Sequence, residues 1–263
     1  MSQAAEQADA AAPARRVVEL ENVCLLREGS ALLDHISIGL EEGKCTVVMG
    51  ASGSGASCFL KTAAGIMTPS KGKVLAWGQD IETMSAQEQF IFREKLGFVF
   101  QDAALWANMS GFQNIALPFQ FHRRGMSQEE IAARIADIAQ EFEFQGNLQL
   151  RPVGLSTGER KLISFMRAMI LEPPMLFLDD PTGSIDNTAA KHILRILLKY
   201  KEEGRTLIMA THDPVYTLRL ADNLIILRHG KMVEHGAFAS VRASRDPYIR
   251  DVLSESLHLP DGM

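Results

Sequence analysis

The sequence has no apolar run near the ~20 residues that a helix needs to cross a bilayer. It holds only three cysteines, Cys24, Cys45 and Cys58, whose spacing is typical neither of a metal site nor of disulfide pairing. Positive charge is also scarce, because 27 Lys and Arg face 32 Asp and Glu and leave a net charge of −5. This balance argues against nucleic acid as the main partner. The deficits together favour a soluble, acidic protein of a reducing cytosol.

The domain organisation follows from length and from the two ends of the chain. At 263 residues the chain is long for one domain and short for two. Its start, "MSQAAEQADAAAPA", has no strongly apolar stretch, which excludes a secretory signal and predicts a disordered tail over 1–16. We expect a single domain over 17–240 and a C-terminal helix and tail over 241–263.

Short apolar runs alternate with helical patterns, which predicts an α/β sheet. The runs are "CTVVM" (45–49), "MLFLDD" (175–180) and "TLIMA" (206–210). A polar, helix-rich insert at about 103–172 lies between the first two, and one of its helices begins at a capping box formed by Ser127 and Glu130. The carboxyl ends of the strands are expected to build the functional site.

Residues 50–57 read "GASGSGAS", the frame of a phosphate-binding loop, G-x-x-x-x-G-K-[S/T], with Ala56 in the lysine position. A strand precedes the segment and a helix follows it, as such a loop requires. Its glycines let backbone N–H groups turn toward an anion, and the helix N-terminus adds its dipole. Taken alone, the segment is also compatible with a flexible Gly/Ser loop.

Four further segments place polar residues at strand ends or at a helix start. They are "VFQD" (99–102), "LSTGER" (155–160), "FLDDPTGSID" (177–186) and "THD" (211–213). Together with the Gly-rich loop they form an ordered series. This series resembles the nucleotide-binding subunit of ABC transporters over roughly residues 17–240. The resemblance implies a P-loop NTPase core of ABC-ATPase type with an inserted helical subdomain.

The resemblance also implies roles for individual residues. Asp180 would stand in the general-base position, and His212 would contact the γ-phosphate. Mg²⁺ would be held by Ser57, Gln101 and Asp179. In this family two subunits sandwich ATP between the phosphate loop of one and the signature segment of the other, which corresponds here to Leu155–Glu159. The implied ATP-binding residues are Gly50, Ser52, Gly53, Ser54, Gly55, Ala56, Ser57, Cys58, Gln101, Ser156, Gly158 and Asp186.

The sequence departs from the family pattern at four places. Ala56 replaces a lysine, Asp180 replaces a glutamate, Thr157 replaces a glycine, and Arg27 stands where an aromatic side chain usually stacks on adenine. At an effective dielectric near 20, two unit charges ~4 Å apart interact by about 4 kcal/mol. We expect a net loss of about 2–4 kcal/mol from the missing lysine, or roughly 30- to 1000-fold in affinity.

Other lysines of the chain are poorly placed to compensate. Lys61 is ~140° around the helix and ~7.5 Å further from the phosphates, so its ammonium is expected to point away. Lys44 lies at the far end of the strand, roughly 20 Å off. Whether a partner chain supplies the missing positive charge stays open from the sequence.

The resemblance implies partners as well. The segment Asp102–Met109, which contains Trp106, would receive a helix of a membrane permease. A second subunit, most simply an identical copy, would complete the ATP sites. A narrower similarity of "GFVFQDAALWANMSGFQNIALPF" and "SRDPYIRDVL" is to Mla-type ATPases, which power phospholipid transport with MCE-type lipid-binding proteins. The chain would then lie peripherally on the cytoplasmic face of the cell membrane.

Two functions remain open from the sequence. The first is an energy-coupling subunit that hydrolyses ATP slowly. The second is a non-hydrolysing subunit with a structural or regulatory role.

Overall fold

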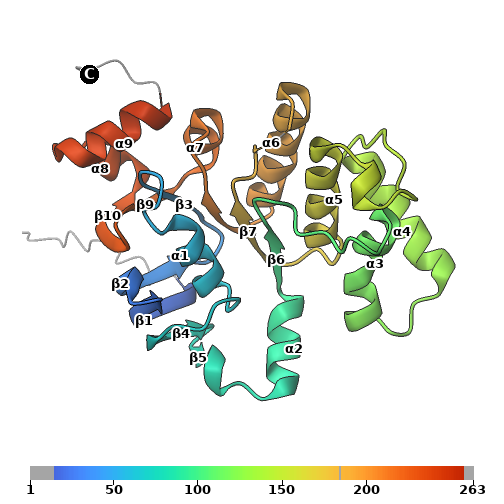
Figure 1. Ribbon diagram of the computed structural model, residues 1–263, viewed down its shortest axis with the longest axis horizontal. Coiled ribbons are helices and arrows are strands. Elements are labelled where there is room, and N and C mark those ends of the chain that lie inside the picture. The colour runs from blue at the N-terminus through green and yellow to red at the C-terminus, as the bar shows by residue number, and fades with distance from the viewer. Residues whose placement is uncertain (1–14, 184, 258–263) are drawn as a thin grey trace, which may run out of the picture.

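Two β-sheets form the framework of the protein (Figure 1), a computed structural model that describes residues 15–183 and 185–257. The larger sheet has six strands in the order β10-β9-β3-β8-β7-β6. Five of them run parallel, and β10 pairs antiparallel with β9. The strands are β3 (Cys45–Met49), β6 (Leu96–Val99), β7 (Met175–Asp179), β8 (Thr206–Ala210), β9 (Asn223–Arg228) and β10 (Lys231–Ala237). The predicted strands at 45–49 and 206–210 are confirmed, and the third ends one residue earlier than predicted.

The smaller sheet is antiparallel and has the strand order β2-β1-β4-β5. Its strands are β1 (Arg16–Arg27), β2 (Ser30–Glu41), β4 (Lys71–Ala76) and β5 (Gln79–Asp80). Sequence reasoning missed this sheet. The pairing of β1 with β2 shifts register between Leu20 and Val23 and again before Leu25, so that neighbouring apolar residues are buried and no simple alternation is visible.

The strand β3 is buried on both faces, and each face packs against a different layer. Val47 and Met49 belong to the cluster that includes α5 (Thr157–Met169), α6 (Asn187–Glu202) and α7 (Pro214–Leu220). Val48 points the other way, toward α1 (Ala56–Ala63) and the antiparallel sheet. This two-sided burial explains why the strand is apolar at every position but Thr46.

The segment between β6 and β7 is mainly helical and lies to the right of the sheet in Figure 1. It contains α3 (Gly111–His122), α4 (Gln128–Glu141), the short helix η2 (Pro152–Gly154) and α5, while η1 (Ile81–Thr83) and α2 (Ala86–Glu94) precede β6. A capping box begins α4, as predicted, and another begins α5. The buried face of α4 consists of Ile131, Ile135 and Ile138.

The chain ends in α8 (Phe238–Arg242) and α9 (Pro247–Leu257), which lie at the upper left in Figure 1. The predicted N-terminal tail lies outside the described residues up to position 14, and β1 begins at Arg16. Among the helices that the structure describes, none has the length and apolar character needed to cross a membrane.

Candidate functional site

Apart from the segment 155–160, the polar segments singled out from the sequence follow strands at one edge of the large sheet. The strands β3, β8 and β7 are neighbours and run parallel, so their carboxyl ends lie side by side. The Gly-rich loop follows β3, His212 follows β8 by two residues, and Asp179 and Asp180 stand at the end of β7. This is the edge at which open α/β sheets bind ligands.

The Gly-rich loop has the backbone of a phosphate cradle. Gly53 and Gly55 have φ of 77° and 103°, and a Cβ on Gly50 would lie 2.2 Å from the carbonyl oxygen of Leu227. Gly55 caps α1 without any side-chain hydrogen bond to the first turn. The N–H groups of that turn therefore remain available to an anion. Ser52 is exposed and Ser54 is buried within the loop.

The loop is held in shape from outside by the C-terminal part of the chain. The Ala51 N–H donates to the Tyr248 hydroxyl at 3.2 Å, and this hydroxyl donates to the Leu227 carbonyl at 2.8 Å. The Gly230 N–H donates to the Ser54 carbonyl at 2.9 Å. Sequence reasoning missed Tyr248, which lies on α9 and shows no pattern linking it to the loop.

The implied metal ligands Ser57 and Asp179 are in contact. The Ser57 hydroxyl donates to Asp179 Oδ1 at 2.7 Å, while Asp179 is 1% exposed and its Oδ2 has no hydrogen-bond partner among the described residues. A hydroxyl beside a buried carboxylate with a spare oxygen fits Mg²⁺, which prefers hard oxygen ligands. Next to Ser57, partial burial raises the pKa of the Cys58 thiol.

The expectation for Lys61 is wrong. Its ammonium lies 3.5 Å from Asp179 Oδ2 instead of pointing away from the site. The angle around a helix locates only the Cα of a residue, whereas a lysine carries its charge on a flexible four-carbon stem. That stem brings the ammonium back to the end of β7. Lys61 thus contacts a predicted metal ligand from a position five residues beyond Ala56 on α1.

Sequence reasoning also missed Lys161, a buried lysine beneath the site. Its Nζ donates to the carbonyls of Phe100 at 2.9 Å, Gln101 at 3.2 Å and Asp179 at 3.3 Å. The signal that could have found it is a lysine on the buried face of α5, in line with Ser164 and Phe165. Burial lowers the pKa of Lys161, while the nearby carboxylate of Asp180 raises it.

The same ammonium fixes the position of Gln101 relative to Asp179, since it binds a backbone oxygen of each. The side chain of Gln101 is exposed at the mouth of the site. The structure therefore joins Ser57 directly to Asp179 and places the backbone of Gln101 near that of Asp179.

Asp180 has an unusual conformation. Its φ is 48°, and its N–H donates to the Ala210 carbonyl at 2.9 Å. A Cβ on Gly183 would lie 2.5 Å from Asp180 Oδ2, so the carboxylate folds over that glycine. His212 is exposed directly after β8, and Asp213 caps α7. Ser184, which separates Gly183 from the rest of the predicted loop, lies outside the described residues.

The signature segment lies on the helical insert, at the start of α5. The Ser156 hydroxyl accepts from the Glu159 N–H at 3.2 Å, and Arg160 donates to the Thr157 hydroxyl at 3.1 Å. Ser156 and Thr157 are exposed and Gly158 is half-buried. Asp186 is exposed too and caps α6 by accepting from two N–H groups. The signature residues and Asp186 line one cleft, so the structure brings them together.

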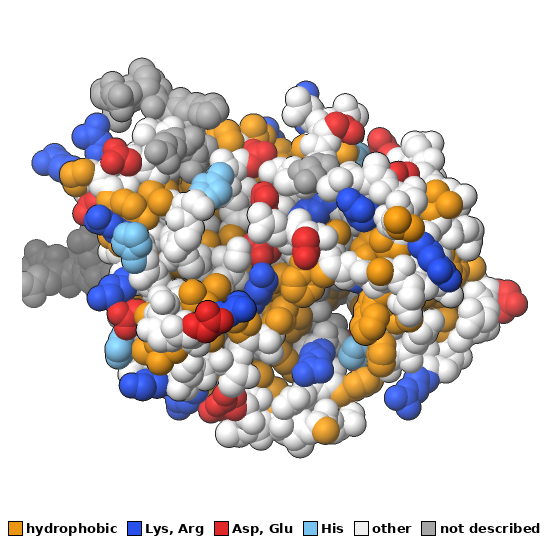
Figure 2. Space-filling view, viewed as in Figure 1, with side chains coloured by type: hydrophobic (Ala, Val, Ile, Leu, Met, Phe, Trp, Pro, Cys, Tyr) orange, Lys and Arg blue, Asp and Glu red, His pale blue; other side chains and the backbone are white. Residues whose placement is uncertain are grey.

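A groove of about 380 Å³ lies between α2 and α3, next to the segment Asp102–Met109. Figure 2 shows the hollow with hydrophobic side chains at its rim. Trp106 is 60% exposed and Phe121 58% exposed, and both line the groove. Trp106 is therefore a surface residue rather than part of the core.

The segment Asp102–Met109 is held by two side chains beneath it. Asn114, fully buried, accepts from the Trp106 N–H at 2.8 Å and donates to the carbonyls of Trp106, Met109 and Ser110. Arg167 donates to the carbonyls at positions 103 and 104. Burial lowers the pKa of Arg167 to about 10.

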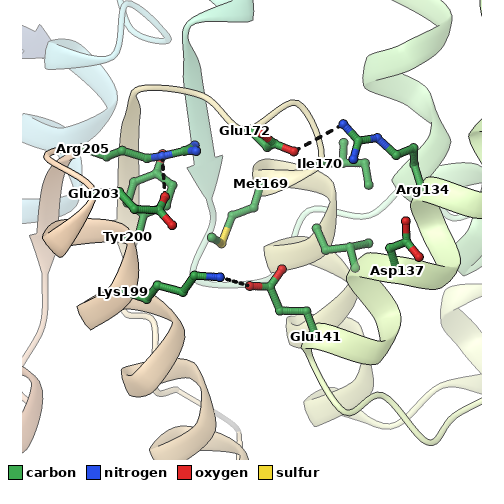
Figure 3. A pocket seen from close by; sticks show the side chains of 11 residues that line it. Arg134, Asp137, Glu141, Met169, Ile170, Glu172, Lys199, Tyr200, Glu203 and Arg205 are labelled. Atoms are coloured by element: carbon green, nitrogen blue, oxygen red, sulfur yellow. Dashed lines mark hydrogen bonds and ion pairs between the residues drawn. The ribbon is translucent and has the colours of Figure 1, made fainter.

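A cleft of about 280 Å³ lies elsewhere, between α4 and α6 (Figure 3). Three ion pairs span or line it, and they join Arg134 to Glu172, Lys199 to Glu141, and Arg205 to Glu203. Because its cations are paired with carboxylates of the same chain, the cleft offers little charge to a ligand.

Comparison with known proteins decides the family. The family model described as ABC transporter matches residues 33–183, the part that contains the phosphate loop, the signature segment and the end of β7. The chain belongs to the ABC transporter family. It is an ATP-binding subunit of that family.

The relatives of this ABC protein are named for different transport systems. It is 28% identical over 238 residues to the intermembrane phospholipid transport system ATP-binding protein MlaF of Escherichia coli K12, covering 90% of this chain and 88% of MlaF. It is 34% identical to an uncharacterized ABC transporter ATP-binding protein of Methanocaldococcus jannaschii, over 77% of this chain and 89% of that one. It is 35% identical to the sulfate/thiosulfate import ATP-binding protein CysA of Caulobacter vibrioides, over 78% of this chain and 60% of CysA.

Solved structures agree with the fold. The ABC protein resembles the dimeric post-hydrolysis state of the ATP-binding cassette MJ0796 bound to ADP and Pi, with a TM-score of 0.78 and 28% identity over 84% of this chain and 98% of that one. The predicted P-loop core of ABC-ATPase type is confirmed.

Proposed function

We propose that this chain is the nucleotide-binding subunit of a phospholipid transporter, that it docks on a membrane permease, and that it binds ATP but hydrolyses it slowly. The observation that carries the proposal is the intact cradle around an uncharged loop. The open N–H groups of α1 and the Ser57–Asp179 pair remain, while Ala56 supplies no charge.

Each residue of the site has a defined part in this function. The loop N–H groups bind the phosphates. Mg²⁺ would be held by the Ser57 hydroxyl, the Asp179 carboxylate and the Gln101 side chain. The metal, when bound, neutralises charge on the phosphates. Asp180 would orient the attacking water and His212 the γ-phosphate.

Dimerisation is part of the proposal. Ser156, Thr157 and Asp186 are exposed on the helical side of the chain, where a second copy would meet them with its own phosphate loop. MJ0796, which the chain resembles, is dimeric in its solved structure. The groove beside Trp106 would receive the permease, and the chain would lie peripherally on the cytoplasmic face of the membrane.

Phospholipid as the cargo rests on the similarity to MlaF, which extends over nine-tenths of this chain. Vesicles containing the chain with its permease should move a labelled phospholipid and not labelled sulfate when ATP is supplied. Movement of sulfate alone would contradict the lipid assignment, since CysA is also a relative. MCE-type lipid-binding proteins are the expected further partners.

The catalytic part is tested by phosphate release from the same complex. Slow turnover that disappears with His212→Ala would support hydrolysis at this site. A rate no higher than that of the His212→Ala complex would support the second candidate function, a non-hydrolysing subunit. The conformation of Asp180 favours this alternative, because its short carboxylate folds over Gly183.

A further inference from the structure

The site has a cation that the phosphate loop itself lacks. The ammonium of Lys61 lies 3.5 Å from Asp179 Oδ2, and its side chain is 33% exposed. The other oxygen of the same carboxylate accepts from Ser57, the residue directly after Ala56. One buried carboxylate therefore separates the ammonium from the hydroxyl at the base of the phosphate loop.

The second lysine of the site is not available for this purpose. An ammonium has three N–H donors, and Lys161 directs its Nζ to three backbone carbonyls. Lys161 is also 1% exposed. Within the described part of the chain, Lys61 instead makes a single ionic contact at 3.5 Å, longer than a charged hydrogen bond. Its stem is flexible and partly in solvent, so the ammonium can approach a bound phosphate.

Lys61 also occupies one side of the carboxylate that would hold Mg²⁺. A positive charge on Asp179 Oδ2 and a divalent ion at the same carboxylate repel each other. The lysine therefore supplies positive charge to the site and reduces the gain in ATP affinity that Mg²⁺ would give.

We propose that Lys61 is the resident cation of this nucleotide site: it replaces part of the charge lost at position 56, and it makes ATP binding depend only weakly on Mg²⁺. This inference rests on the proposed function, because it requires that the site binds nucleotide.

The test is the Kd of a fluorescent ATP analogue for the purified chain, measured with Mg²⁺ and with EDTA. Wild type should bind in both buffers, with affinities that differ by less than about threefold. Lys61→Met should weaken binding in EDTA by about tenfold, the effect of 1.4 kcal/mol, and should regain a large dependence on Mg²⁺. Lys61→Arg should keep the wild-type behaviour, because it keeps the charge.

Lys44→Met is the matched control, since it removes one exposed lysine at the far end of β3. Its affinity should equal that of wild type in both buffers. If Lys61→Met also equals wild type in EDTA, the inference is overturned while the proposed function stands. If wild type binds no nucleotide in either buffer, both are overturned. The melting temperature of each variant shows that an affinity change is not a folding defect.

Discussion

The docking groove and the nucleotide site differ in what supports them. Under the segment Asp102–Met109, the buried Asn114 and the half-buried Arg167 pair with the backbone. In the nucleotide site Tyr248 and Gly230 also hydrogen-bond the backbone, but the cation at position 56 is missing and Asp179 Oδ2 has no hydrogen bond from the described residues. The difference separates two properties of one subunit. The segment that we propose for docking is held by side-chain hydrogen bonds, whereas the loop that we propose for ATP has no cation at position 56.

Removing the support of the docking segment should have the largest effect on stability. Asn114→Leu deletes the four hydrogen bonds that this fully buried side chain makes with backbone groups. At about 1 kcal/mol for each bond, the free energy of unfolding should fall by about 4 kcal/mol. Urea denaturation measures it. Gln120→Leu, an exposed change on the same helix, should stay within about 0.5 kcal/mol. A loss below about 1 kcal/mol for Asn114→Leu would show that the segment does not depend on this side chain.

Restoring the missing charge at position 56 should strengthen ATP binding at the nucleotide site. Ala56→Lys is expected to strengthen ATP binding by about 2–4 kcal/mol, roughly 30- to 1000-fold. It should also raise the rate of phosphate release, because the same charge stabilises the transition state. Isothermal titration gives the affinity. Ala56→Gln adds length without charge and should gain little. Equal affinity for both variants would mean that charge is not what the loop lacks.

Trp106 tests the groove without disturbing its support. Its side chain is 60% exposed, so Trp106→Ala should change the free energy of unfolding by less than about 0.5 kcal/mol. Binding to the permease should weaken by about 2 kcal/mol or more, as for an aromatic anchor at an interface. Co-purification with the permease and a binding titration measure this effect. Phe142→Ala would be a poor control because that residue is in the core, whereas exposed Val153→Ala should leave binding unchanged.

The smallest effect should come from acid titration of His122 at the edge of the groove. Burial lowers its pKa below the ordinary 6.5, Glu94 raises it and Arg123 lowers it. Between the folded and unfolded pKa values the unfolded chain binds more protons, so stability falls as the pH drops below about 6.5. His122→Gln should lose less stability than wild type between pH 7 and pH 5. An identical pH profile for the two proteins, measured by thermal unfolding, would remove His122 from the list of acid-sensitive groups.

Much of the core could be predicted from the sequence because its signals are local. The runs 45–49 and 206–210 are buried on both faces and so are apolar except for one threonine in each. The capping boxes at Ser127 and Ser156 depend on residues three positions apart. The order of the polar segments indicated the family, which the family model confirms. The roles assigned to the individual site residues stay predictions.

What could not be predicted depends on contacts between distant residues. The register shifts of β1 hide the antiparallel sheet from any alternation rule. Lys61 was misplaced because a helical wheel does not describe where a long side chain ends. Lys161 and Tyr248 act on backbone groups 60 or more positions away, and no spacing in the sequence reports such pairs.

The hydrogen bond between Tyr248 and the phosphate loop has a consequence for the order of synthesis. Its two partners are 197 residues apart. At roughly 5–20 residues per second, the ribosome adds Tyr248 about 10–40 s after Ala51. During that interval the loop lacks its outer brace, although β3 and α1 are already made. A nascent chain of this protein therefore acquires its finished phosphate cradle only near the end of translation.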